Sequence, residues 1–231
     1  MMRQVEIIAH TGCEGTPDNT IESCYAGYHA GASVLEVDVR TTKDHIAVLH
    51  HDDIAALQET TYAELISGGR QLERLDTVLK AFKGVPVSFN LDLKTEEAAN
   101  AAMAAIEATE TWEQVWFTGA TSLVEQSPHA GHVMWNLPNI SSELPEEQYR
   151  SEIGAWVDRA ARAGYRGINA HYESCRRALV EEAHGLGLQV WIYTLPGSPV
   201  LFERYADMEV DGISVYDVSD FVRQKRERLD R

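Results

Sequence analysis

The chain has 231 residues, of which 44% are hydrophobic and 24% charged, and its formal net charge at pH 7 is −16. This length allows one large domain with a sizeable core, and the acidic balance argues against binding to a nucleic-acid backbone, which would need a basic stripe. No apolar stretch approaches the roughly 18 residues of a membrane span. The three cysteines have no paired spacing, so we expect a cytoplasmic protein without a disulfide framework.

Strand-like and helix-like patterns alternate through the first half of the chain. Strands are predicted at 5–10, 33–41, 46–52 and 85–94, with a turn at 42–45 between the second and the third. Helices are predicted at 19–31, 74–84 and 95–110. Asn19 or Thr20 would cap the first of these helices, and Gly31 would end it.

The same alternation continues through the second half. Strands are predicted at 114–119, 132–137, 167–171, 188–194 and 211–216, and helices at 122–127, 146–164, 174–187, 198–208 and 218–231. About eight strand–helix units predict a TIM (β/α)8 barrel, in one domain over residues 1–231. A doubly wound open sheet is the alternative, but no glycine-rich phosphate loop supports it.

Acidic side chains lie on one face of two predicted strands. Side chains alternate along a strand, so Glu36 and Asp38 share a face, as do Asp92 and Lys94. In a barrel the opposite, apolar faces pack against the helices, and the acids face inward, where unpaired carboxylates are costly. We therefore predict a site for a hard divalent cation at Glu36, Asp38 and Asp92, either Mg²⁺ or Ca²⁺, with Mn²⁺ also possible. The alternative is that Asp92 pairs with Lys94 while the first two acids face solvent on an edge strand.

Two histidines end predicted strands. His10 ends the first strand, and His51 ends the strand after the turn at 42–45. Strand ends of this kind meet at the mouth of a barrel, where imidazoles suit general acid and base roles. His171 is a weaker candidate for lining the pocket, and Trp191 is more consistent with the core. No GxSxG motif indicates a serine nucleophile.

In order and spacing, these motifs resemble those of the glycerophosphodiester phosphodiesterase family. The matching segments are His10-Thr11-Gly12, Pro17-Asp18-Asn19-Thr20, Glu36-Val37-Asp38-Val39, Thr42-Lys43-Asp44, His51-Asp52 and Asp92-Leu93-Lys94. The resemblance implies a TIM-barrel enzyme of lipid metabolism that hydrolyses a small glycerophosphodiester-like molecule to an alcohol and a phosphomonoester. It implies metal ligands at Glu36, Asp38 and Asp92, catalytic histidines at His10 and His51, and a substrate-binding lysine at Lys94.

The chain departs from the family pattern where the family contacts its substrate. Thr11 stands in place of the arginine of His-Arg-Gly, which contacts phosphate in the family. Asp18 and Asp92 stand where glutamate is usual, and Tyr193 and Pro196 stand where tryptophan and asparagine are usual. The metal and acid–base residues are kept, so these departures bear on substrate specificity more than on the reaction.

Three alternatives to hydrolysis remain open on the sequence. Phospholipase D-like lyases resemble the same His, acid and Lys pattern, lack the arginine, and release a cyclic phosphate. A non-catalytic ligand-binding barrel would explain the changes at the positions where the family contacts its substrate. A different metal-dependent reaction on sugar phosphates is the third, because a fold does not determine a function.

Overall fold

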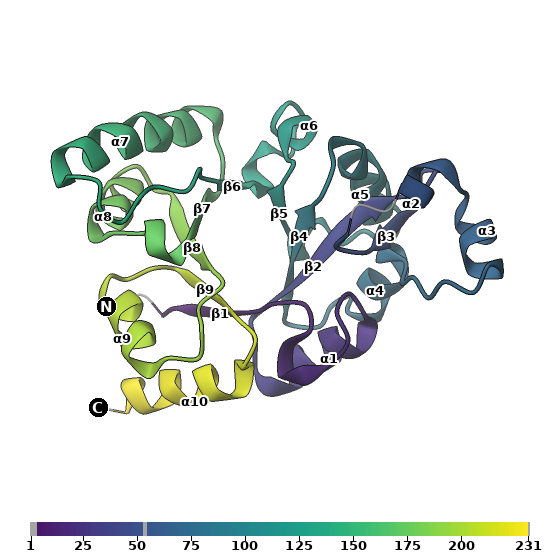
Figure 1. Ribbon diagram of the computed structural model, residues 1–231, viewed down its shortest axis with the longest axis horizontal. Coiled ribbons are helices and arrows are strands. Elements are labelled where there is room, and N and C mark those ends of the chain that lie inside the picture. The colour runs from purple at the N-terminus through teal and green to yellow at the C-terminus, as the bar shows by residue number, and fades with distance from the viewer. Residues whose placement is uncertain (1–3, 53–54, 231) are drawn as a thin grey trace.

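Eight parallel strands curl into a barrel in the computed structural model, which describes residues 4–52 and 55–230 (Figure 1). The strands are β1 (Glu6–Ala9), β2 (Val34–Thr41), β4 (Ser88–Leu93), β5 (Val115–Gly119), β6 (Met134–Asn136), β7 (Gly167–His171), β8 (Gln189–Tyr193) and β9 (Gly212–Val215). Their order is β5-β4-β2-β1-β9-β8-β7-β6, and a parallel bridge between Phe117 and Val133 brings β5 next to β6. The predicted TIM barrel is confirmed, and the open-sheet alternative is wrong.

Helices surround the strands in Figure 1 and lie close to their predicted positions. They are α1 (Ile21–Ala30), α4 (Leu75–Ala81), α5 (Glu96–Thr109), α6 (Ser122–Glu125), α7 (Glu146–Ala163), α8 (Arg177–Gly185), α9 (Pro199–Asp207) and α10 (Val218–Leu229). The Thr20 hydroxyl caps α1 by accepting the N–H of Ser23, and Gly31 ends the helix with a φ of 99°. Residue 231, the last of the predicted C-terminal helix, lies outside the described residues.

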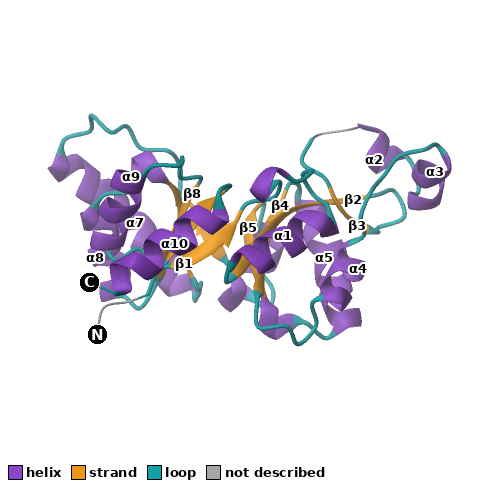
Figure 2. Cartoon of the chain, turned by 90° about the horizontal axis from the view of Figure 1, so that it is seen from below, coloured by secondary structure: helices purple, strands orange, loops and turns teal. Residues whose placement is uncertain are grey.

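The segment after β2 leaves the barrel and returns to it. β3 (Ala47–Leu49) pairs antiparallel with β2 and is shorter than the predicted strand 46–52. The helices α2 (Ala55–Glu59) and α3 (Tyr62–Ser67) were not predicted from the sequence, and they stand off from the barrel beyond β3 (Figure 2). They are short, and they are held beside β3 by a small apolar cluster of Val48, Leu57 and Leu65 and by a hydrogen bond from the Tyr62 N–H to Asp44 Oδ1.

The two faces of the strands pack into different layers. Leu35, Val37 and Val39 of β2 join the large core beneath the helices, whereas Ile8, Val34, Met134 and Trp191 form a separate cluster inside the barrel. The second cluster makes an apolar floor, above which the inward-facing positions become polar. Within the described part of the chain, no helix has the length and apolarity needed to span a membrane.

Close packing of β7 against β8 leads to a first prediction. A Cβ atom on Gly167 would lie 2.4 Å from the carbonyl oxygen of Gln189 and 2.8 Å from the Met134 side chain. Because the first neighbour is backbone, Gly167→Ala should lower the free energy of unfolding by about 1–3 kcal/mol, measured by urea denaturation. Gly185→Ala is the control, since nothing lies within 4 Å of the added atom. An equal loss of stability in both variants would contradict this account.

Candidate active site

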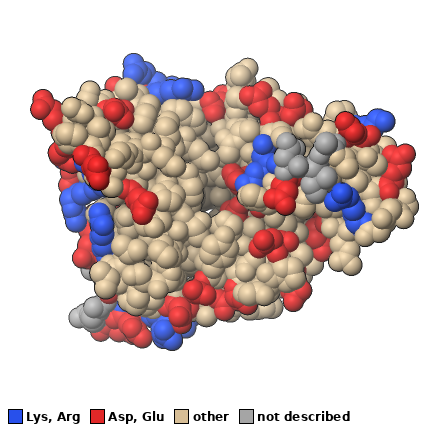
Figure 3. All heavy atoms as spheres, viewed as in Figure 1, with Lys and Arg blue, Asp and Glu red and all other residues tan. Residues whose placement is uncertain are grey.

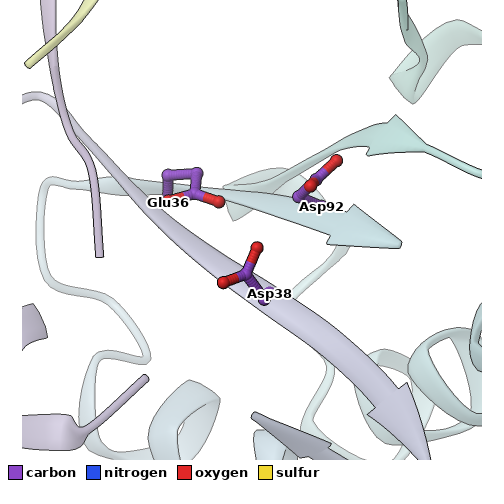
Figure 4. A group of neighbouring side chains, drawn as sticks. All are labelled: Glu36, Asp38 and Asp92. Carbon is purple, nitrogen blue, oxygen red and sulfur yellow. The ribbon is translucent and has the colours of Figure 1, made fainter. Parts of the chain in front are cut away.

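Neighbouring parallel strands bring three carboxylates together. Asp38 of β2 lies opposite Asp92 of β4 in the sheet register, and Glu36 lies one inward-facing position before Asp38. One carboxylate oxygen from each side chain can be chosen so that the three lie within 4.8 Å of one another, and Figure 4 shows the three side chains gathered between β2 and β4. A hard cation with metal–oxygen distances of about 2.0–2.6 Å can join ligand atoms that far apart. The donor set and its spacing therefore suit one divalent cation of the magnesium or calcium type.

The alternative of solvent-facing acids on an edge strand is wrong. β2 lies between β1 and β4, and only 8% of Glu36 and 1% of Asp38 is exposed. The second part of that alternative, an ion pair between Asp92 and Lys94, is present in the structure. The structure therefore combines inward-facing acids with a lysine counterion.

Lys94 bridges two of the acids. Its Nζ atom lies 2.7 Å from Asp38 Oδ1 and 2.5 Å from Asp92 Oδ2. Burial acts to lower the pKa of Lys94, but its ion pairs with Asp92 and Asp38 outweigh this and raise it. The Thr118 hydroxyl also donates to Asp92 Oδ1 at 3.0 Å. Three carboxylates and one ammonium carry two uncompensated negative charges, which one divalent cation would balance.

Glu36 is the carboxylate that most needs a further positive charge. Burial raises the pKa of Glu36 well above its usual range, and the nearby Asp38 and Asp92 raise it further. The backbone N–H of Thr11 donates to Glu36 Oε2 at 2.9 Å and partly opposes this rise. A bound divalent cation would favour the ionised form of Glu36.

Thr11 also connects to Asp38, through Asn19. The Thr11 hydroxyl accepts the backbone N–H of Asn19 at 2.5 Å. The Asn19 side chain then donates to Asp38 Oδ2 at 2.8 Å and accepts the Asp38 N–H at 2.9 Å. Asn19 has a φ of 58°, a left-handed conformation that asparagine tolerates. Thr11, only 3% exposed, thus positions Glu36 directly and Asp38 through Asn19.

His10 lies beside the carboxylates. Its ring packs on Tyr216 with centroids 4.5 Å apart, and its Nδ1 lies 3.7 Å from Glu36 Oε2. Nδ1 also lies 2.9 Å from the carbonyl oxygen of Thr11. A carbonyl can only accept, so Nδ1 is the donor in this contact, and Nε2 is left to face the site.

His51 lies in a neighbouring, more open hollow. Its side chain is 65% exposed, and Nδ1 is 3.1 Å from Asp52 Oδ1. Arg40 holds the His51 carbonyl oxygen, with Nε at 3.1 Å and Nη2 at 2.9 Å. The hollow, of about 730 Å³, is also lined by Asn19, which bonds to Asp38, and by His50. His51 is therefore near the carboxylates but not packed against them as His10 is.

The face of the molecule in Figure 3 is hollowed near its centre. Charged side chains of both signs gather just to the right of this hollow, and the surface just to its left is neutral. Beneath the carboxylates lies a smaller cavity of about 120 Å³, lined among others by His10, Glu36 and Tyr193. The ring of His171, the weaker sequence candidate, lies 5.9 Å from that of Tyr193.

Comparisons with known proteins agree on one family. Residues 10–220 match the model of the glycerophosphoryl diester phosphodiesterase family. A glycerophosphodiester phosphodiesterase from Parabacteroides distasonis is similar in structure, with a TM-score of 0.79, 22% identity, and coverage of 99% of this chain and 100% of that one. The corresponding enzyme from Thermotoga maritima has a TM-score of 0.74 and 22% identity, covering 96% of this chain and 99% of that one.

A third similar structure contains a ligand. It is an Oleispira antarctica phosphodiesterase in complex with the product sn-glycerol-3-phosphate, with a TM-score of 0.75, 20% identity, and coverage of 98% of this chain and 97% of that one. At such identities these structural likenesses show the fold. No curated protein matches the chain significantly.

The position of Thr11 leads to a second prediction. Thr11→Val keeps the shape of the side chain but leaves the buried N–H of Asn19 without its acceptor, so the free energy of unfolding should fall by about 1–3 kcal/mol. Urea denaturation without added divalent cations measures this effect. Thr11→Ser restores the hydroxyl and should recover most of the loss. Equal destabilisation by Val and Ser would show that the methyl group matters instead.

Proposed function

The chain belongs to the glycerophosphoryl diester phosphodiesterase family, and on this premise we propose that its phosphodiesterase reaction depends on a divalent cation and on two histidines. The substrate is a small glycerophosphodiester-like molecule, which water cleaves to an alcohol and a phosphomonoester. The observation that carries the proposal is the set of three converging carboxylates, within 4.8 Å, beside His10. The glycerol phosphate bound to the Oleispira antarctica neighbour supports this choice of substrate.

Glu36, Asp38 and Asp92 hold the cation, which is Mg²⁺ or Ca²⁺, with Mn²⁺ also acceptable to oxygen ligands. When bound, such an ion neutralises a nonbridging phosphate oxygen and stabilises the charge that develops in the transition state. Lys94 already lies on two of the ligands, and it provides a second positive contact for the phosphate.

The two histidines move the protons. As water attacks phosphorus, one imidazole takes a proton from the water. The bond from phosphorus to the alcohol oxygen breaks, and the other imidazole gives that oxygen a proton. Nδ1 of His10 lies against the Thr11 carbonyl oxygen, and Nδ1 of His51 lies against Asp52 Oδ1. Both therefore keep Nε2 available for the reaction.

One observation, the threonine at position 11, favours a second outcome of the same chemistry, the release of a cyclic phosphate. Thr11 stands where the family has an arginine that contacts phosphate. It is buried and bonded to Asn19, so this position provides no positive charge for the phosphate. The lyases that share this absence release a cyclic phosphate by attack of a substrate hydroxyl. Phosphorus NMR of the product separates the two outcomes, since hydrolysis gives a phosphomonoester and internal attack gives a cyclic diester.

Removal of the cation is the third prediction. A chelator should abolish turnover of glycerophosphodiesters, and Mg²⁺, Ca²⁺ or Mn²⁺ should restore it. Asp92→Asn should weaken cation binding at least about tenfold, because an amide oxygen carries no net charge. Isothermal titration calorimetry measures this directly. Asp220→Asn, an exposed residue of α10 paired with Arg223, is the matched control and should bind the cation as the wild type does. Full activity in the presence of chelator would refute metal dependence.

The paired histidines provide the fourth prediction. His10→Ala and His51→Ala should each lower kcat by about 10² to 10⁴, the usual contribution of a general acid or base. His50→Ala is the matched control, since His50 lines the same hollow as His51 and should keep most of the activity. Circular dichroism checks that all three variants fold. Loss of activity in His50→Ala with retention in His51→Ala would reverse the assignment.

A further inference from the structure

Neutral polar side chains line the barrel interior directly below the carboxylates. All eight barrel strands contribute to the cavity of about 120 Å³, and six of them provide its uncharged polar side chains, Asn90, Thr118, Asn136, Asn169, Trp191 and Ser214. The interior of a TIM barrel is usually packed with branched apolar residues. We refer to this cavity as the polar chamber.

Two buried polar atoms in the polar chamber have no hydrogen-bond partner among the described residues. They are Nε1 of Trp191, a residue only 1% exposed, and Oγ of Ser214, a residue 5% exposed. Other lining groups bond to each other, as Asn169 Nδ2 does to Asn136 Oδ1 at 2.8 Å. An unsatisfied buried group costs about 1–3 kcal/mol. The polar chamber therefore has both the space and the free donors and acceptors for a hydrogen-bonding guest.

The floor of the polar chamber holds the indole in place. A Cβ atom on Gly212 would lie 2.6 Å from Trp191 Cδ1 and 2.8 Å from Nε1, so the absence of a side chain there lets the ring lie against β9. Ile8, Val34 and Met134 complete the apolar cluster around the ring. At its other end the chamber is lined by Glu36 and other residues of the proposed active site. A guest would therefore approach from the side of the carboxylates.

The lining selects the chemistry of the guest. No lysine or arginine is among the described residues that line the polar chamber, so a phosphate group has no counterion there and remains beside Lys94. The indole N–H can only donate, so it needs an acceptor atom on the bound molecule, and an ammonium group has none. Neutral hydroxyl groups can use both donors and acceptors. The volume corresponds to about four water molecules at roughly 30 Å³ each, which is also the scale of a three-carbon polyol.

We propose that the polar chamber binds the hydroxylated alcohol of the phosphodiester, with Trp191 Nε1 and Ser214 Oγ bonded to its hydroxyl groups. The inference rests on the proposed function, because it places the phosphate at the carboxylate cluster and the alcohol below it. Selectivity for a neutral polyol would then depend on residues deep in the barrel rather than on the rim.

Two diesters that differ only in hydroxyl groups test the proposal. They are glyceryl p-nitrophenyl phosphate and propyl p-nitrophenyl phosphate, assayed with Mg²⁺ or Ca²⁺. Wild-type protein should prefer the glyceryl diester in kcat/KM. Trp191→Phe combined with Ser214→Ala should reduce this preference about ten- to a hundredfold, as expected for two lost hydrogen bonds. Ser214→Ala alone leaves Trp191 and the apolar floor intact and should lose part of the preference for the glyceryl diester. If the double variant does not fold, this single variant tests the proposal.

Ser33→Ala is the control variant. Ser33 is half-buried just before β2, with its hydroxyl 3.4 Å from the carbonyl oxygen of Ile7, and the preference should be unchanged. An unaltered preference in the Trp191 and Ser214 variants would overturn the proposal and mean that the polar chamber holds ordered water only.

A separate result would show that the proposed function itself fails. Should wild-type protein turn over neither diester, calorimetric titration of glycerol 3-phosphate against propyl phosphate tests the polar chamber alone. Tighter binding of glycerol 3-phosphate, lost in Ser214→Ala, is the expected result. Equal binding of the two phosphomonoesters would overturn the proposal.

Discussion

Confinement of negative charge inside the barrel is the constraint on which the rest of this structure depends. β2 and β4 are hydrogen-bonded in a register that sets Asp38 opposite Asp92, and the apolar residues between the acids are committed to the core beneath the helices. A slip of one residue would turn every one of these side chains to the wrong layer. The acids are therefore held inward by the packing of their neighbours, and the interior must compensate their charge. Lys94 compensates part of it.

Thr11 contributes to the site by supporting the carboxylates from the turn after β1. Thr11 follows the carboxyl end of β1, and its side chain is buried. Its N–H and hydroxyl join Glu36 and Asn19. Side chains that orient metal ligands affect binding almost as strongly as the ligands do. Thr11 therefore supports the carboxylate geometry, and Lys94 provides positive charge beside the acids.

The sequence predicted those features that depend on periodicity and order, and it missed those that depend on distant contacts. Alternation along β2 predicts that Glu36 and Asp38 share a face, and eight strand–helix units predict the barrel. The role of Asn19 was not predicted, because its partner Asp38 lies 19 positions away and no local pattern links them. The helices α2 and α3 have too few apolar residues for a clear period. The polar chamber draws its lining from all eight strands of the barrel, so nothing in a single stretch of sequence indicates it.

Polarity changes in layers along the barrel axis, and this order has a consequence for chemistry. An apolar floor around Trp191 is followed by neutral amides and hydroxyls, then by carboxylates with Lys94, and then by the open hollow at His51. Electrostatic interactions strengthen where water is excluded, so a phosphate beside Lys94 is held more strongly than one at the exposed rim. His10 lies at the buried side of the carboxylates and His51 at the exposed side. The layering therefore places the two histidines in different environments. In the proposed reaction, an alcohol that leaves toward solvent would meet His51, and one retained in the barrel would lie near His10.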